Sequence, residues 1–270
     1  QHSFTGIPMR AVIYQSPGVV AIADVPRPTI VESTDAIVRV TLAGICGTDL
    51  HVVRGDFQGI EAGAVVGHEF VGEVVEVGRA VQRMRLGDKV MSSDFTACGH
   101  CTWCGLGDHW HCADRAFFGT GTSFGPALAG AQAEFVRVPH ADTTLGLLPA
   151  ECSEEAALLI GDNLATGWVA VERAGTEPGD CAVVIGGGAV GQLAALSAQA
   201  AGAGIVVVVE PNGQRRAFAQ AHGSLAAHPD EAESTVRRAT DGTGADVVFE
   251  AVGGNGPMDL AMKLARPRGR

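Results

Sequence analysis

Two short stretches early in the chain bring together side chains that can bind a metal or carry a proton. They are residues 44–51 and 67–69, and their candidate groups are Cys46, Thr48, His51, His68 and Glu69. Cysteine as thiolate and histidine as neutral imidazole are usual zinc ligands, and a catalytic zinc takes three protein ligands and leaves a fourth position open. The two stretches therefore predict part of a catalytic zinc site, whose third ligand must come from elsewhere in the chain.

A second group of cysteines lies in one short segment that is too small to hold a core of its own. Its members are Cys98, Cys101, Cys104 and Cys112. Four thiolates leave no open position on the metal, which is typical of a structural tetrahedral zinc. Disulfides and a redox Cys-x-x-Cys are alternatives, and His100, His109 and His111 are candidate substitute ligands. We expect the segment to hold a loop in place without taking part in catalysis.

A glycine fingerprint in the second half predicts a dinucleotide site. Residues 186–191 read Gly-Gly-Gly-Ala-Val-Gly, after an apolar strand predicted at 182–185 and at the start of a helix predicted at 188–201. In this pattern the first glycine permits a tight turn, the second lets the pyrophosphate approach the backbone, and the third lets helix and strand pack closely. The phosphates meet the positive end of the helix. The predicted contact residues of this loop are Gly186, Gly188, Ala189, Val190 and Gly191.

An acidic residue after the next predicted strand favours NAD. Glu210 follows Gly191 by nineteen residues and would accept hydrogen bonds from the adenosine ribose while repelling a 2′-phosphate. Arg215 could reach the same ribose and slightly weakens this preference, because an arginine there can accommodate a 2′-phosphate. NADP is therefore kept as the less favoured cofactor. The alternative is that the glycines only pack and that Glu210 is a solvated strand end.

The elements that must position these groups fall into two parts. Short β-branched strands predicted at 9–14, 19–24, 37–43, 71–77 and 134–138 indicate a β-barrel-like domain. A helix start predicted at Ser153 ends the strand-rich part of the chain and indicates a domain boundary nearby. Beyond it, strands at 182–185, 205–210 and 245–251 alternate with helices at 188–201, 214–221 and 231–239, which predicts an α/β domain with a parallel sheet. We place the domains at 1–163 and 164–270, and expect the second to be incomplete at its C-terminal end, because Arg270 lies where a next strand should begin.

Bulk composition narrows the class of function. The 270 residues suit two domains, and 30 acidic against 19 basic side chains argue against binding to nucleic acid or to an anionic membrane. No apolar run approaches the roughly 18 residues of a membrane span, and the amino terminus lacks the pattern of a secretion signal. We therefore expect a cytoplasmic protein that acts on a small molecule.

Four motifs in order along essentially the whole chain now carry a resemblance. The stretches 44–51 and 67–72, the four-cysteine lobe and the glycine fingerprint together resemble the zinc-dependent medium-chain alcohol dehydrogenase family. The resemblance implies an N-terminal GroES-like β-barrel catalytic domain and a Rossmann doubly wound domain. It also implies an NAD-dependent oxidoreductase that interconverts a primary or secondary alcohol and its aldehyde or ketone, with two zinc ions per chain, and a homodimer or homotetramer if the full-length chain is present.

The resemblance also assigns the catalytic metal ligands. Cys46 and His68 match the family's first two zinc ligands, and Glu69 resembles the carboxylate that can approach the metal when water leaves. The third ligand is often a cysteine before a Thr-Gly pair, and that position here is Asp162. Aspartate keeps the ligand charge of a thiolate, although it departs from the Cys₂His site. The alternative is that Asp162 caps the helix that follows.

Proton transfer is assigned by the same resemblance. Thr48 would take the alcohol proton, the nicotinamide ribose would pass it on, and His51 would deliver it to solvent. The alternative is that Thr48 is a helix cap and His51 an exposed helix residue. Asp49, between them, is expected to orient His68.

Further positions have weaker signals. Thr166 resembles the threonine that contacts the nicotinamide face, and Val252 resembles a cofactor-contacting position. Asp94 stands where the family often has a bulky apolar residue, which predicts a pocket for a polar alcohol or polyol. The remaining cysteines, Cys152 and Cys181, are predicted to be buried structural thiols.

Two other classes of function compete with this interpretation. A zinc-free reductase of enones or quinones could use the same scaffold, but the ligand set Cys46, His68 and Asp162 argues against it. A non-catalytic or truncated protein is the second alternative, and failure of the purified chain to bind NADH would favour it.

Overall fold

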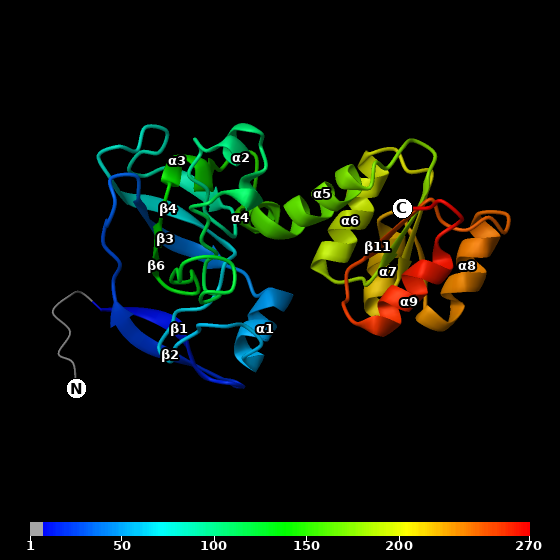
Figure 1. Cartoon of the computed structure of the whole chain (residues 1–270), viewed down its shortest axis with the longest axis horizontal. Helices are drawn as coiled ribbons and strands as arrows, with labels where there is room; N and C mark the ends of the chain where they lie inside the picture. Colours follow the sequence, from blue (N-terminus) through cyan, green and yellow to red (C-terminus); the bar gives the residue numbers. More distant parts are fainter. Residues whose placement is uncertain (1–7) are drawn as a thin grey trace. The chain divides into compact units, whose positions relative to one another are not determined.

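The chain divides into two compact units. The computed structural model describes residues 8–270. The units are Gln1–Asp162 and Asn163–Arg270, both drawn in Figure 1. Their boundary lies one residue before the one expected from the sequence. Within the described residues, no helix has the length and apolar character needed to cross a membrane.

A five-stranded antiparallel sheet organises the first unit. Its order is β6-β3-β4-β5-β7, and its strands are β3 (Ala36–Ala43), β4 (Phe70–Val77), β5 (Lys89–Ser92), β6 (Phe135–Val138) and β7 (Leu145–Leu147). Irregular pairing along β3 indicates β-bulges, which bend a strand. The apolar side chains of one face meet in a core that includes Val38, Phe70 and Phe118. A separate antiparallel pair is formed by β1 (Pro8–Ser16) and β2 (Val19–Pro26).

Short helices lie in the connections between these strands. They are α1 (Gly47–Arg54), α2 (Thr102–Gly105), the 3₁₀ helix η1 (His109–His111), α3 (Ala141–Thr144) and α4 (Glu154–Leu159). The hydroxyl of Ser153 accepts the backbone N–H of Ala156 at 3.2 Å, so the predicted cap of α4 is confirmed. The backbone N–H of Cys46, just before α1, donates to the carboxylate of Asp49 at 2.9 Å.

A π-helical turn follows α4 and carries Asp162. This turn, η2 (Ile160–Leu164), runs on into α5 (Ala165–Arg173), and such wide turns often occur at functional sites. Gly161 packs so closely on the carbonyl of Ser92 at the end of β5 that a Cβ would collide with it. The alternative in which Asp162 caps the next helix is wrong, because Asp162 lies inside continuous helical backbone and Leu164 precedes α5.

The second unit is a doubly wound parallel sheet. Its order is β10-β9-β8-β11, with β8 (Cys181–Ile185), β9 (Ile205–Val209), β10 (Leu225–Ala227) and β11 (Val247–Glu250). Its helices are α5, α6 (Ala189–Ala200), α7 (Gly213–Ala221), α8 (Ala232–Ala239) and α9 (Asn255–Leu264), with the 3₁₀ helix η3 (Pro229–Glu231) before α8. Helices α5, α6 and α7 contribute to the core on one face, and α8 and α9 to the core on the other. The central strands are rich in valine because both faces are covered.

The backbone after α9 pairs with β11. Val248 N–H donates to the carbonyl of Arg270, and Arg270 N–H donates to that of Asp246, each at 2.9 Å. Each strand and helix predicted from the sequence has a counterpart in the structure. Strands β5, β7 and β10, of three or four residues each, were not predicted.

Candidate metal and cofactor sites

Three distant parts of the first unit bring four ligand atoms together. Cys46 precedes α1, His68 and Glu69 precede β4, and Asp162 lies in η2. The ligand atoms of these four residues all lie within 4.8 Å of one another. Asp162 Oδ2 lies 3.3 Å from His68 Nε2 and 3.7 Å from Cys46 Sγ.

These separations fit a zinc ion. Bonds of roughly 2.0–2.3 Å in a tetrahedron place neighbouring ligand atoms roughly 3.3–3.8 Å apart. His68 is 1% exposed, and its Nε2 is buried without a well-aligned hydrogen bond. A buried imidazole nitrogen in that condition, facing a thiol and a carboxylate, matches the donor set of a catalytic zinc.

One buried carboxylate supports two of the candidate ligands. Asp49 Oδ1 lies 3.3 Å from His68 Nδ1, and Asp49 Oδ2 accepts the N–H of Cys46. Asp49 is 5% exposed. It therefore lies where it can fix both the ring of His68 and the backbone that carries the thiol.

The metal-free site holds a proton on His68. Burial opposes a charged ring, but the contacts with Asp162, Asp49 and Cys46 outweigh it and raise the pKa of His68 to about 12. The protonated ring balances the nearby carboxylates, and zinc must displace this proton in order to bind.

A pH dependence of the metal-free protein follows. Because the pKa of His68 is raised above its ordinary value of 6.5, its stabilising contribution is full below that pH and is lost as the pH rises towards about 12. We expect the unfolding midpoint of chelator-treated protein to fall more steeply between about pH 6.5 and 10 than that of chelator-treated His68→Gln. Parallel curves would contradict the assignment, and His222→Gln should behave as the unchanged protein.

Asp94 lies within the electrostatic reach of this site. Burial, and then the charge of Asp162, raise the pKa of Asp94 to about 7, although His68 opposes the shift. Ser93 Oγ donates to Asp94 Oδ1 at 3.3 Å. The predicted preference for a polar substrate stays a prediction.

An aromatic cluster adjoins His68 and was not among the predicted site residues. The ring of Phe117 lies 5.3 Å from that of His68, and it also packs against Phe95, Trp110 and Phe124. The available signal was the concentration of aromatic residues in 95–124 of a chain that has few elsewhere. Phe117 therefore covers one side of His68, and the other three rings pack against Phe117.

The two relay candidates lie on one helix. Thr48 and His51 are three residues apart in α1, so they share a face of that helix. His51 Nδ1 lies 2.9 Å from Asp56 Oδ2, and the imidazole ring is 5.9 Å from that of Phe57. The side chain of His51 is 54% exposed. This exposure suits a group that exchanges protons with solvent, while the relay itself stays a prediction.

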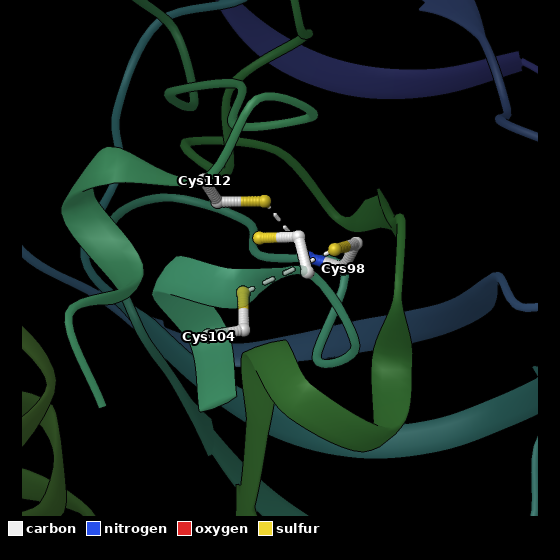
Figure 2. Close-up of side chains that lie close together, drawn as sticks. Cys98, Cys104 and Cys112 are labelled. Atoms are coloured by element: carbon white, nitrogen blue, oxygen red, sulfur yellow. Dashed lines mark hydrogen bonds between the residues drawn. The ribbon is translucent and has the colours of Figure 1, made fainter. Parts of the chain in front are cut away.

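The four cysteines of the predicted structural site also converge. Cys98, Cys101, Cys104 and Cys112 have sulfur atoms within 4.8 Å of one another, and Figure 2 shows three of them turned toward one another. Cys98 Sγ and Cys104 Sγ are 4.0 Å apart, against roughly 3.8 Å expected around a tetrahedral zinc with bonds of about 2.3 Å. All seven cysteines lie in the described residues and are free thiols, so the disulfide alternative is wrong.

The thiols of this lobe differ in pKa because their surroundings differ. The backbone N–H of Cys104 holds the pKa of Cys101 down to about 6, while burial raises the pKa of Cys104 to about 12. Metal binding would release the proton of the buried thiol. His100 contacts the carbonyl of Cys98 and His111 pairs with Asp108. The thiols alone therefore offer a complete ligand set.

The last two cysteines differ from each other. Cys181 is buried in the second unit, as predicted. Cys152 is only partly buried, so the prediction of a buried thiol is wrong there, because it lies in the turn just before α4 rather than under a sheet.

The glycine fingerprint lies where strand β8 passes into α6. Gly186 has a φ of 101°, and Gly188 precedes the first turn of α6, which begins with Ala189 and Val190. A Cβ on Gly191 would collide with the carbonyl of Gly186. The loop therefore presents backbone N–H groups at the positive end of a helix, as a pyrophosphate requires.

Glu210 is held against this loop. Its Oε2 accepts the N–H of Gly187 at 2.7 Å, its Oε1 accepts that of Asn212 at 2.8 Å, and it is 4% exposed. Arg215 Nη1 lies 3.8 Å from the same carboxylate. The carboxylate is therefore fixed beside the fingerprint rather than solvated.

The two remaining cofactor candidates have different surroundings. Val252 follows β11, where its side chain lies against Gly186. Thr166 is exposed on α5, beside Gly167, which packs on Ala194 of α6. Val252 thus joins the fingerprint cluster directly, while Thr166 belongs to a neighbouring helix.

Known proteins resemble both units. The sequence model of the alcohol dehydrogenase GroES-like domain matches residues 32–149, and that of the zinc-binding dehydrogenase family matches residues 189–270. The chain is 40% identical over 262 residues to a protein of Mycobacterium tuberculosis named as a probable zinc-binding alcohol dehydrogenase, covering 97% of this chain and 66% of that one.

Solved structures agree with the sequence matches. An alcohol dehydrogenase from Thermus sp. ATN1 superposes with a TM-score of 0.90 and 38% identity, covering 97% of this chain and 75% of that one. A protein of Sinorhizobium meliloti 1021 named as a putative zinc-binding dehydrogenase, solved with NADP bound, gives a TM-score of 0.83 and 28% identity over 97% of this chain and 75% of its own. The chain spans about two thirds to three quarters of the length of these relatives.

Proposed function

This chain belongs to the zinc-dependent medium-chain alcohol dehydrogenase family, and from that premise we propose that it interconverts a primary or secondary alcohol and its aldehyde or ketone with NAD. The observation that carries the proposal is the convergence of Cys46, His68 and Asp162. Family and fold make the protein an oxidoreductase of the zinc alcohol dehydrogenase type. The cofactor preference, the substrate class and the residue roles are our proposal.

The three ligands would hold a zinc ion whose charge they balance. Cys46 as thiolate and Asp162 as carboxylate each contribute one negative charge, and His68 contributes a neutral donor. When bound, zinc acts as a Lewis acid that polarises the alcohol oxygen and lowers its pKa. Asp49 keeps the ring of His68 and the backbone of Cys46 in place, and Glu69, at 5% exposed, supplies a further buried carboxylate beside them.

Proton removal is assigned to α1. The hydroxyl of Thr48 would accept the substrate proton, and His51 would release it to solvent. The contact between His51 Nδ1 and Asp56 favours the tautomer with the proton on Nδ1. The other ring nitrogen, Nε2, is then available to accept the incoming proton.

The second unit would bind the nicotinamide cofactor, which accepts hydride from the alcohol. Backbone N–H groups at the start of α6 would face the pyrophosphate. Glu210, fixed beside them, would accept hydrogen bonds from the adenosine ribose and disfavour a 2′-phosphate. This supports NAD as the preferred cofactor.

A single substitution tests the cofactor preference. Glu210→Gln keeps an oxygen that can accept the N–H of Gly187 but removes the negative charge. We expect the ratio of kcat/KM for NAD to that for NADP to fall by roughly tenfold or more, because like-charge repulsion of the 2′-phosphate is lost. The control is Glu233→Gln, because Glu233 is an exposed carboxylate on α8. This variant should leave the NAD-to-NADP ratio of kcat/KM unchanged. An unchanged ratio in Glu210→Gln would contradict the role.

The proposed activity is tested with a panel of primary, secondary and polyhydroxy alcohols. We expect NAD-dependent NADH formation that is lost on chelation and restored by zinc. Zinc-independent reduction of an enone or quinone, without alcohol oxidation, would favour the zinc-free class instead. The cytoplasmic location and a homodimer or homotetramer belong to the same proposal, and light scattering of the purified protein checks the assembly.

A further inference from the structure

We propose that Gln132 is a positioning residue of the zinc site, which acts on Cys46 and His68 through Asp49. The inference rests on the proposed catalytic zinc. Gln132 lies three residues before β6, and its backbone bonds to Val12 of β1 and to Val66. It is 86 residues from Cys46, 64 from His68 and 30 from Asp162 in sequence.

The side-chain amide of Gln132 makes two contacts with the ligand-bearing stretch. Its Nε2 donates to the carbonyl of Gly44 at 3.0 Å and to Asp49 Oδ2 at 3.2 Å. An amide NH₂ has two hydrogens, so both are used. Because both neighbours are oxygen acceptors, only this orientation of the amide satisfies them.

Asp49 passes this restraint to both ligands. Its Oδ2 receives two N–H groups, from Gln132 and from the backbone of Cys46. Its Oδ1 faces His68 Nδ1 at 3.3 Å and has no well-aligned hydrogen bond of its own. The rotation of the carboxylate, and with it the position of Oδ1 against the ring, is therefore set by the two donors on Oδ2.

The backbone of Gln132 is itself anchored beside His68. Gln132 N–H donates to Val66 O at 2.9 Å, and its carbonyl accepts Val12 N–H at 2.8 Å. Gly67, next to His68, has a φ of 94° and packs so tightly on Gln132 that a Cβ would collide with it. Gln132 thus contacts the stretch that carries Cys46 through its side-chain amide and the stretch that precedes His68 through its backbone.

Two variants remove the contacts in different ways. Gln132→Met keeps the length of the side chain and removes both donors. Gln132→Glu replaces the donor with a carboxylate oxygen, which faces the oxygens of Gly44 and Asp49. The matched control is Gln199→Met, because Gln199 Nε2 also donates to two oxygens, His222 O and Ser224 Oγ, in the other unit.

The measurement is the dissociation constant of the zinc ion at the Cys46, His68 and Asp162 site, identified as the ion that His68→Ala no longer binds and determined by chelator competition without substrate or cofactor. We expect both Gln132 variants to weaken it roughly 10-fold or more, within the range for residues that orient metal ligands, with Gln132→Glu the more severe. Gln199→Met should stay within about twofold of the unchanged protein. Affinities of the Gln132 variants within twofold of the unchanged protein would overturn the proposal.

A double substitution tests the route through Asp49. In an Asp49→Asn background, Gln132→Met should change the zinc dissociation constant little further, because the contact between Gln132 and the Asp49 carboxylate has already been altered. Full additivity of the two changes would overturn the route. If both Gln132 variants fail to fold, side-chain amide exchange in the unchanged protein replaces them: slow exchange of the Gln132 NH₂ supports the contacts, and fast exchange overturns them.

The two proposals fail separately. If the protein binds two zinc ions but oxidises no alcohol, the proposed function fails while the zinc-affinity test of Gln132 still applies. If alcohol oxidation is found but the Gln132 variants bind zinc as tightly as the unchanged protein, only this inference fails. The d–d absorption of cobalt-substituted protein gives an additional readout of ligand geometry at the site.

Discussion

Replacing His68 with alanine should abolish alcohol oxidation and leave the zinc of the four-cysteine lobe in place. His68 supplies the only imidazole of the converging ligand atoms, and its removal leaves a thiol and carboxylates without a nitrogen donor. Because a Lewis acid supplies several kcal/mol of transition-state stabilisation, we expect kcat/KM to fall roughly 1,000-fold or more.

Steady-state assays and metal analysis check this result together. Bound zinc should fall from two ions per chain to about one. His222→Ala, in the second unit, is the matched histidine control and should keep both ions and full activity. Activity above roughly a tenth of the original in His68→Ala would contradict the assigned ligand role.

Replacing Cys104 with serine should destabilise the first unit without touching the catalytic ligands. Cys104 is 7% exposed and its sulfur faces the other three thiols. A structural zinc contributes directly to folding free energy, so its loss should lower the unfolding midpoint by about 10 °C or more.

Calorimetry of zinc-loaded protein measures this effect. Cys152→Ser, which changes a partly buried thiol outside the cluster, should shift the midpoint far less. After chelation, the unfolding midpoints of Cys104→Ser and of the unchanged protein should differ much less than those of the zinc-loaded proteins. A large difference that persists without metal would show that the thiol contributes by packing instead.

The local part of the site was predictable from the sequence. Cys46 and His68 lie in short stretches of unusual composition, and the four cysteines are close in the chain, so residue type and spacing were sufficient signals. The alternation of valine-rich strands and helices predicted the parallel sheet of the second unit, and the GroES-like and Rossmann fold is confirmed.

The long-range part was not predictable from local signals. Asp162 could be proposed only through the family resemblance, because no periodicity connects it to Cys46, and the π-helical turn that carries it has no reliable sequence signal. The contact of Phe117 with His68 and the contacts of the Gln132 amide depend on side-chain packing between distant segments. The assigned roles of Thr48, His51 and Glu210 stay predictions, since geometry alone does not show proton transfer or cofactor choice.

Anomalous diffraction at the zinc edge from crystals of the zinc-loaded protein tests the central claim most directly. We predict an ion bonded at roughly 2.0–2.3 Å to Cys46 Sγ, His68 Nε2 and a carboxylate oxygen of Asp162. A second peak should lie among the four thiols. An ion absent from the first position, or one that leaves the Asp162 carboxylate outside bonding distance, would contradict the account.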